Sequence, residues 1–249
     1  MAVVPNEEPE RAGSAGREQF TATHWTEVAK AAARDGSGEA RAALDSLCLR
    51  YWPAIYSFLR RRNHKPQDAE DLTQGFFAHL LEENAIARAD RGRGRFRSFL
   101  LGALQRYLLI EYRREGAQKR GRGKLVFSMD FAGMEETYLE NVDPTLTPDQ
   151  AFDRQWAVSL LEGAYAVLEA EFRDAGQLDR FGQFRRFLSE DPEEGEYAAL
   201  AERLGLTVKS ISSAVARLRG RYREVVRRAV LATVSEPDEV GPELQELFR

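Results

Sequence analysis

The chain is poor in the residues that carry redox and metal chemistry. Its 249 residues include one cysteine and three histidines, and the histidines lie far apart, at positions 24, 64 and 79. The lone Cys48 cannot form an internal disulfide, and its apolar helical surroundings predict a buried, inert thiol. The sequence has no CxxC pair, no HExxH pair, no P-loop and no dinucleotide-binding fingerprint. We therefore expect no metal site, no cofactor and no catalytic residue.

Long apolar runs and extended segments are also missing. No stretch approaches the roughly 18 consecutive apolar residues that a membrane-spanning helix needs, and the polar, acidic first 20 residues do not resemble a signal peptide. We expect a cytoplasmic protein. Alternating β-branched runs are almost absent, whereas apolar residues recur every three or four positions nearly throughout the chain. This spacing predicts an all-α protein, in which only residues 125–131 could be extended.

The net charge of −4 hides an uneven distribution of charge. Residues 88–124 hold twelve Arg or Lys and three acids, and residues 203–228 hold eight Arg or Lys and one acid. Residues 129–150 between them hold six acids and no Lys or Arg. Two cationic segments separated by an acidic one indicate two nucleic-acid-binding modules joined by a linker.

Glycine, proline and charge runs set the predicted domain boundaries. We expect two small helical domains, residues 40–115 and 148–233, because a basic, glycine-punctuated break and an acidic stretch with two prolines separate them. These separating residues, 116–147, form a basic and then acidic linker. Residues 1–39 are an N-terminal extension with a short helix, and residues 234–249 are a C-terminal extension. The chain is 43% hydrophobic, which is enough for a core in each domain.

The most informative segment is residues 197–219, where two helices joined by a tight turn predict a helix-turn-helix in the second domain. Ala201 is small where the helices would cross, Gly205 can adopt a positive φ, and Thr207 can cap the second helix. Ile211 and Val215 would anchor that helix in the core. The side chains left facing outward, which we predict contact DNA, are Thr207, Lys209, Ser210, Ser212, Ser213, Arg217, Arg219 and Arg221. An ordinary helical hairpin with a solvated basic face would have similar features.

The first cationic segment combines arginines with aromatic residues. Aromatic rings can stack on unpaired bases while arginines hold the backbone, so this segment is a candidate for binding separated DNA strands. The predicted contacts are Arg95, Arg97, Gln105, Arg106, Arg113 and Arg114. Phenylalanines at helical spacing are more often core residues, and we expect Phe99 and Tyr107 to be buried.

Residues 68–83, DAEDLTQGFFAHLLEE, resemble a helix of the extracytoplasmic-function (ECF) class of bacterial RNA polymerase sigma factors. In that family the helix, usually D-A-E-D-L-x-Q-E-x-F, binds the clamp of the polymerase beta-prime subunit. The matching positions, and hence the implied polymerase contacts, are Asp68, Glu70, Asp71, Gln74 and Phe77. Gly75 stands where the family has Glu.

Two further blocks follow in the family's order. Residues 96–115 are similar to the helix that melts and reads the minus-ten promoter element, with Arg113 and Arg114 at matching positions. Residues 197–228 resemble the domain that reads the minus-thirty-five element and touches the beta flap, with Ile211, Val215 and Arg217 at matching positions. The resemblance implies a transcription initiation factor that binds core RNA polymerase and promoter DNA and catalyses nothing itself. It leaves open whether an anti-sigma factor binds the chain.

Several alternatives stay open. A stand-alone helix-turn-helix regulator would bind duplex DNA without polymerase, and a recombinase or nuclease would need a catalytic spacing of carboxylates that the sequence lacks. The acidic linker either imitates RNA phosphates within polymerase or is a solvated tether. The C-terminal residues 235–249 either fold back on the second domain as a brake or form a surface helix or a frayed tail.

Overall fold

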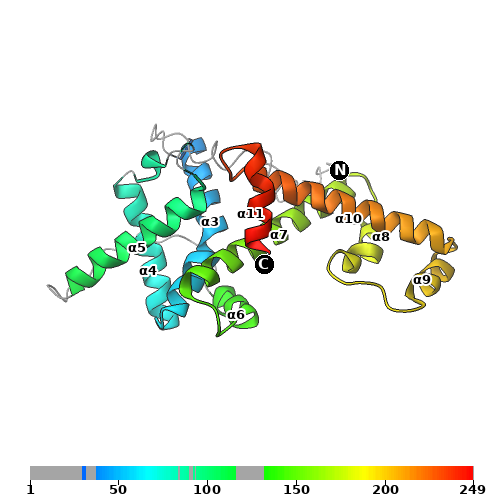
Figure 1. Cartoon of the computed structure of the whole chain (residues 1–249), viewed down its shortest axis with the longest axis horizontal. Helices are drawn as coiled ribbons and strands as arrows, with labels where there is room; N and C mark the ends of the chain where they lie inside the picture. The colour runs from blue at the N-terminus through cyan, green and yellow to red at the C-terminus, as the bar shows by residue number, and fades with distance from the viewer. Residues whose placement is uncertain are drawn as a thin grey trace, which may run out of the picture. The chain divides into compact units, whose positions relative to one another are not determined.

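The computed structural model describes residues 30–31, 38–83, 85–89, 92, 94–115 and 132–248, and no strand occurs among them (Figure 1). The all-α prediction is confirmed. The described α-helices longer than two residues are α3 (Gly38–Arg61), α4 (Pro66–Glu82), α5 (Phe96–Glu115), α6 (Ala132–Asn141), α7 (Pro148–Asp174), α8 (Leu178–Phe184), α9 (Glu196–Leu204), α10 (Val208–Leu231) and α11 (Val240–Leu247). Short 3-10 helices are η1 (Ala85–Arg88), η3 (Arg185–Leu188) and η4 (Pro237–Glu239). No described helix is both long and apolar enough to cross a membrane.

Packing divides the chain into two compact units, and the divisions fall inside helices. The large unit takes in Ala22–Leu160 and Val230–Arg249, and the described part of the small unit is Leu161–Ala229. The predicted boundaries at residues 115, 148 and 233 stay predictions about functional modules, because the packing follows other limits. Most of the predicted N-terminal extension lies outside the described residues. So do residues 116–131 of the predicted linker, which include its basic part and the beginning of its acidic part.

Aromatic side chains of α3 form the core of the large unit. Tyr51 and Trp52 are fully buried. The ring of Tyr51 lies 5.4 Å from that of Phe96 in α5 and 6.4 Å from that of Trp156 in α7, centre to centre. Large buried rings of this kind contribute much of the apolar area that stabilises a small core. The same helix buries Cys48, as predicted.

Gly75 makes room for a tyrosine between α4 and α5. A Cβ atom at this position would overlap the hydroxyl oxygen of Tyr107. Tyr107 is buried, as predicted, and its ring centre lies 5.7 Å from that of Phe76. The glycine at the position where the ECF pattern has Glu therefore has a packing cause, because α4 could not approach Tyr107 this closely with a side chain there.

The acidic segment before α7 is packed on α3 over much of its described length. Glu135 of α6 accepts hydrogen bonds from Arg60, with an Nη2–Oε1 distance of 2.7 Å, and from the Tyr56 hydroxyl. Further along, Arg61 Nε donates to the carbonyl oxygen of Leu146 at 3.0 Å. These contacts anchor the segment at both ends, whereas its acids Glu136 and Glu140 are exposed. Both alternatives for the acidic segment stay predictions.

The C-terminal extension is folded and belongs to the large unit. Val234 and Val240 are buried, and Glu243 of α11 forms an ion pair with Arg97 of α5. The extension is therefore not a frayed tail. Its observed contacts with α5 also correct the hypothesis that it folds back on the second domain.

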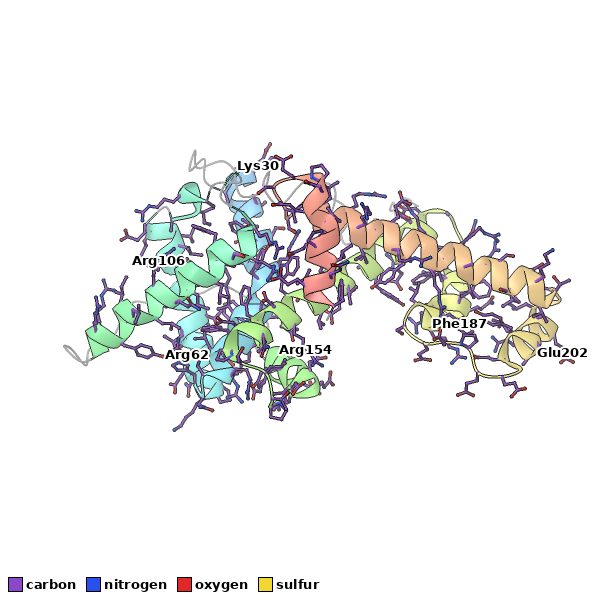
Figure 2. All side chains as sticks on the ribbon, in the orientation of Figure 1. Lys30, Arg62, Arg106, Arg154, Phe187 and Glu202 are labelled. Carbon is purple, nitrogen blue, oxygen red and sulfur yellow. The ribbon has the colours of Figure 1, made fainter. Side chains whose placement is uncertain are left out.

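A second core lies within the small unit. Phe181 and Phe184 of α8 and Phe187 of η3 pack with Ile211 and Val215 of α10, and Figure 2 labels Phe187. The two α10 residues lie four positions apart and so share one face of that helix. Their predicted role as apolar anchors is confirmed.

Candidate nucleic-acid interface

An open groove of about 710 Å³ lies on the large unit, lined by the end of α4, η1 and α5. Helix α5 gives it one face, because positions 99, 103, 106, 110 and 114 follow the helical repeat of 3.6 residues. The lining residues that matter for binding are Arg88, Arg95, Phe99, Arg106 and Arg114.

These side chains give the groove the chemistry of a site for single-stranded nucleic acid. Arg88, Arg106 and Arg114 are exposed, and Figure 2 labels Arg106 on α5. Guanidinium groups can hold backbone phosphates, while the ring of Phe99 offers a face on which a base can stack. Phe99 is only partly buried, which corrects the expectation that it belongs to the core.

Arg97 lies in the core of the large unit. Its side chain is 5% exposed, and it donates hydrogen bonds to Glu243 at 2.8 and 3.2 Å and pairs with Asp153. Burial alone would lower the pKa of Arg97, but the hydrogen bond to Glu243 and the charge of Asp153 raise it, so the guanidinium stays charged. The prediction that Arg97 contacts DNA is wrong, because this arginine neutralises buried acids.

The other predicted contacts in and next to α5 lie either in the lining of the groove or outside it. Arg95, Arg106 and Arg114 line the groove. Gln105 and Arg113 are exposed side chains outside that lining. The structure therefore brings three of the six predicted minus-ten residues together in one site.

Arg88 is a groove residue that the periodic pattern does not identify. It lies in η1, outside the helices that the apolar spacing predicts. The available signal is the run of arginines and glycines at residues 88–95, which marks an irregular cationic segment without telling which arginine faces the groove.

Helix α4 presents acidic side chains to the surface. Pro66 occupies the start of the helix, and Asp68 lies in the first turn, where a negative charge favours the helix dipole. Asp68 and Asp71 are exposed, and Glu70 and Gln74 are partly exposed. Four of the five predicted polymerase contacts are thus accessible.

Phe77, the fifth predicted contact, is a core residue. Its side chain is 3% exposed, and its ring stacks on that of Trp52 with 5.9 Å between the centres. A ring buried to this extent offers almost no surface to another protein. The prediction that Phe77 contacts polymerase is wrong, because the residue packs α4 against α3.

The predicted helix pair of the small unit is present. Helix α9 ends at Gly205, whose φ of 64° is left-handed, and α10 begins at Val208. The hydroxyl of Thr207 accepts a hydrogen bond from the backbone N–H of Ser210 at 3.1 Å, so the predicted cap of α10 is confirmed. The predicted contacts that lie at the surface, with Ser213 partly exposed, are Thr207, Lys209, Ser210, Ser212, Ser213 and Arg217.

Arg219 and Arg221 stabilise the small unit internally. Arg219 donates to the carbonyl oxygens of Phe187 at 2.6 Å and Glu190 at 2.8 Å. Arg221 donates two hydrogen bonds to the carboxylate of Glu171 of α7, at 2.6 and 2.9 Å, and this bidentate pair raises the pKa of the arginine. The structure does not support their predicted role as phosphate contacts.

Residues 47–118, which run from α3 through α5, match the protein-family model for sigma-70 region 2. The chain contains a sigma-70 region 2 domain. This domain indicates a sigma factor, and sigma factors bind core RNA polymerase in transcription initiation. The groove belongs to the region 2 domain, since its lining residues fall within the matched range. No curated protein and no solved structure matches the chain.

Proposed function

We propose that the protein is a sigma factor of the ECF class, which directs core RNA polymerase to promoters and opens the DNA strands there. It acts by binding and performs no chemical step. Strand opening draws on the affinity of the region 2 domain for exposed bases and phosphates of the minus-ten element.

The groove between α4, η1 and α5 is the observation that carries the proposal. Its exposed arginines repeat along one face of α5, and Phe99 lies on the same face. A single strand that follows this face meets phosphate-binding groups at Arg106 and Arg114, about two helical turns apart, with a stacking surface beyond them. Duplex DNA would not expose its bases to such a surface, so the groove favours melted DNA.

The acidic face of α4 is the proposed contact with the clamp of the beta-prime subunit. Asp68 and Asp71 are exposed on the side of the helix opposite the buried Phe76 and Phe77. This placement supports the contact implied by the family pattern, with Phe77 excluded from it.

The helix pair α9 and α10 is the proposed reader of the minus-thirty-five element, as a helix-turn-helix. Short polar side chains at the start of α10 leave room for base edges, and Lys209 and Arg217 can reach the bases or phosphates of a major groove. Ile211 and Val215 face the core, which turns these polar side chains to the surface.

Polymerase binding is tested by gel filtration of the full chain with purified core enzyme. The wild type should co-elute with core, and Asp68→Lys should weaken the complex about ten-fold, since a charge reversal removes one attraction and adds one repulsion. Asp238→Lys is the matched control, because Asp238 is an exposed aspartate of the same unit, in η4, outside the acidic segment before α7. Failure of the wild type to bind core would favour the stand-alone regulator.

The groove is tested by run-off transcription on fragmented genomic DNA, with transcript starts mapped. Arg106→Gln should lower transcription about ten-fold while core binding stays intact, because a charged contact to phosphate is lost. Arg154→Gln removes the same charge from an exposed arginine of the large unit outside the groove, and it should transcribe normally (both arginines are labelled in Figure 2).

A further inference from the structure

Two glutamates of α11 bind the arginines at the start of α5. Arg95 Nη1 lies 2.6 Å from Glu243 Oε2 and 2.5 Å from Glu246 Oε2. Arg97 donates to Glu243 from Nε at 2.8 Å and to Glu246 from Nη2 at 2.9 Å. These two arginines, the two glutamates and Asp153 form one ion-pair cluster, which we call the α11 cluster.

The two glutamates of the α11 cluster differ in burial. The Glu243 side chain is 0% exposed, whereas the Glu246 side chain is 53% exposed. Glu243 is thus fixed in the core beside Val240, and Glu246 is the acid that solvent and ions can reach. The cluster contains three carboxylates and two guanidinium groups, so two carboxylates still balance the two arginines when Glu246 turns away.

Arg95 belongs to the groove as well as to the α11 cluster. Its side chain lines the groove with Phe99 and Arg106 and is 23% exposed. A phosphate that enters the groove at this point meets a guanidinium that already binds two carboxylates, the buried Glu243 and the exposed Glu246, and only Glu246 is free to move into solvent. The phosphate and Glu246 therefore compete for the same donor.

We propose that α11 is a built-in competitor of nucleic-acid phosphate, in which Glu246 occupies Arg95 until a DNA strand displaces it. The proposal rests on the proposed function and adds regulation of the same groove. Glu246 is 53% exposed, and its pairs with Arg95 and Arg97 are in contact with water on this side, so they are weak enough to open. Arg97, Asp153 and Glu243 keep α11 in place meanwhile. The free protein thereby holds single strands less tightly than its arginines would allow.

The test measures binding of a fluorescein-labelled, random-sequence 15-nucleotide single-stranded DNA to the full chain by anisotropy. Glu246→Gln should bind about five-fold more tightly, the ratio that corresponds to the upper range for an exposed ion pair. Its affinity should also fall more steeply with salt, by about 0.7 in the slope of log K against log salt, because one more phosphate contact forms. Asp238→Asn, which removes an exposed acid of the preceding η4, should bind like the wild type.

Arg106→Gln distinguishes failure of the competition by α11 from failure of the groove as a DNA interface. If it weakens binding while Glu246→Gln leaves both affinity and salt slope unchanged, the competition by α11 is refuted and the groove stands. If Arg106→Gln binds the strand as the wild type does, the groove is not the interface, and the proposed function and the role of α11 fail together.

A measurement on the wild type needs no substitution in the cluster. Addition of the oligonucleotide should raise amide hydrogen exchange about three-fold or more in residues 244–247, because displacement of Glu246 removes a contact from the last turn of α11. If saturating DNA leaves the exchange of residues 244–247 unchanged or slows it, the proposal that Glu246 competes with phosphate is refuted.

Discussion

Helix α5 of the large unit and helix α10 of the small unit are both rich in arginine, but each uses part of that charge to hold its own unit together. Arg97 of α5 and Arg221 of α10 bind glutamates of other helices. Arg106 and Arg217 are exposed. The number of cationic residues along a helix therefore overestimates how many can contact DNA, because acidic residues distant in the sequence form ion pairs with some of them.

The largest expected effect is on stability and comes from substitution of Arg97, which would leave Glu243 buried without its main partner. Arg97→Met should lower the free energy of unfolding of the large unit by about 3–5 kcal/mol. Arg106→Met, on the same helix but exposed, should change it by no more than about 0.5 kcal/mol. Urea unfolding followed by circular dichroism measures both, and equal stability of the two variants would contradict the assignment of Arg97 to the core.

Two glycines sharpen the comparison of the units. Gly75→Ala should destabilise the protein by about 1–2 kcal/mol, because overpacking against Tyr107 exceeds the better helix propensity of alanine. Gly182→Ala in α8 meets nothing within 4 Å and should stabilise by up to about 1 kcal/mol. Thermal unfolding measures both. Gly75→Ala/Tyr107→Phe should be more stable than Gly75→Ala alone, and stabilisation by Gly75→Ala would show that α4 and α5 are not in close contact there.

Within α10, substitution of one arginine should affect stability and substitution of another should affect DNA binding. Arg221→Gln should lower the free energy of unfolding by about 1 kcal/mol or less, since Arg221 and Glu171 are both partly exposed and screened. Arg217→Gln should leave stability unchanged and reduce the salt slope of duplex binding by about 0.9, through the loss of one phosphate contact. Chemical unfolding and salt-dependent anisotropy with a promoter duplex test the pair. The reverse pattern would mean that Arg221 is the contact to DNA.

The smallest effect concerns pH. The hydrogen bond from Arg95 lowers the pKa of Glu246 below its ordinary value of 4.5, although partial burial acts in the other direction. A lowered pKa stabilises the fold above the ordinary pKa, and this contribution disappears as the pH falls through the folded value. The stability difference between wild type and Glu246→Gln, below about 1 kcal/mol, should therefore hold from pH 7 to about 4.5 and shrink in more acidic buffer. Thermal unfolding across this range measures it, and a difference that grows on acidification would be inconsistent with the pair.

Local signals in the sequence predict much of this architecture. Apolar spacing identifies the helices that carry Phe76 and Ile211, and the turn at Gly205 with its Thr207 cap follows from the chemistry of those two residues. Both signals lie within a few residues of the structure that they specify, so they can be interpreted without knowledge of the fold.

The parts that the sequence did not predict depend on long-range contacts. Arg97 looks like a DNA contact until Glu243, 146 positions away, is placed beside it. Phe77 matches a polymerase-binding pattern, and only the stacking on Trp52 shows that it is buried. Periodicity gives the face of a helix, but it does not tell which distant element covers that face.

Strand opening by the complex of this protein with core polymerase is the most direct test. Permanganate detects unpaired thymines at a promoter mapped by run-off transcription. The wild type and Arg154→Gln should make the minus-ten thymines reactive, and Arg106→Gln/Arg114→Gln should bind core polymerase but leave the same thymines protected. Thymines that open equally with the double arginine variant, or a wild-type protein that never associates with core polymerase, would contradict a strand-binding groove in the region 2 domain.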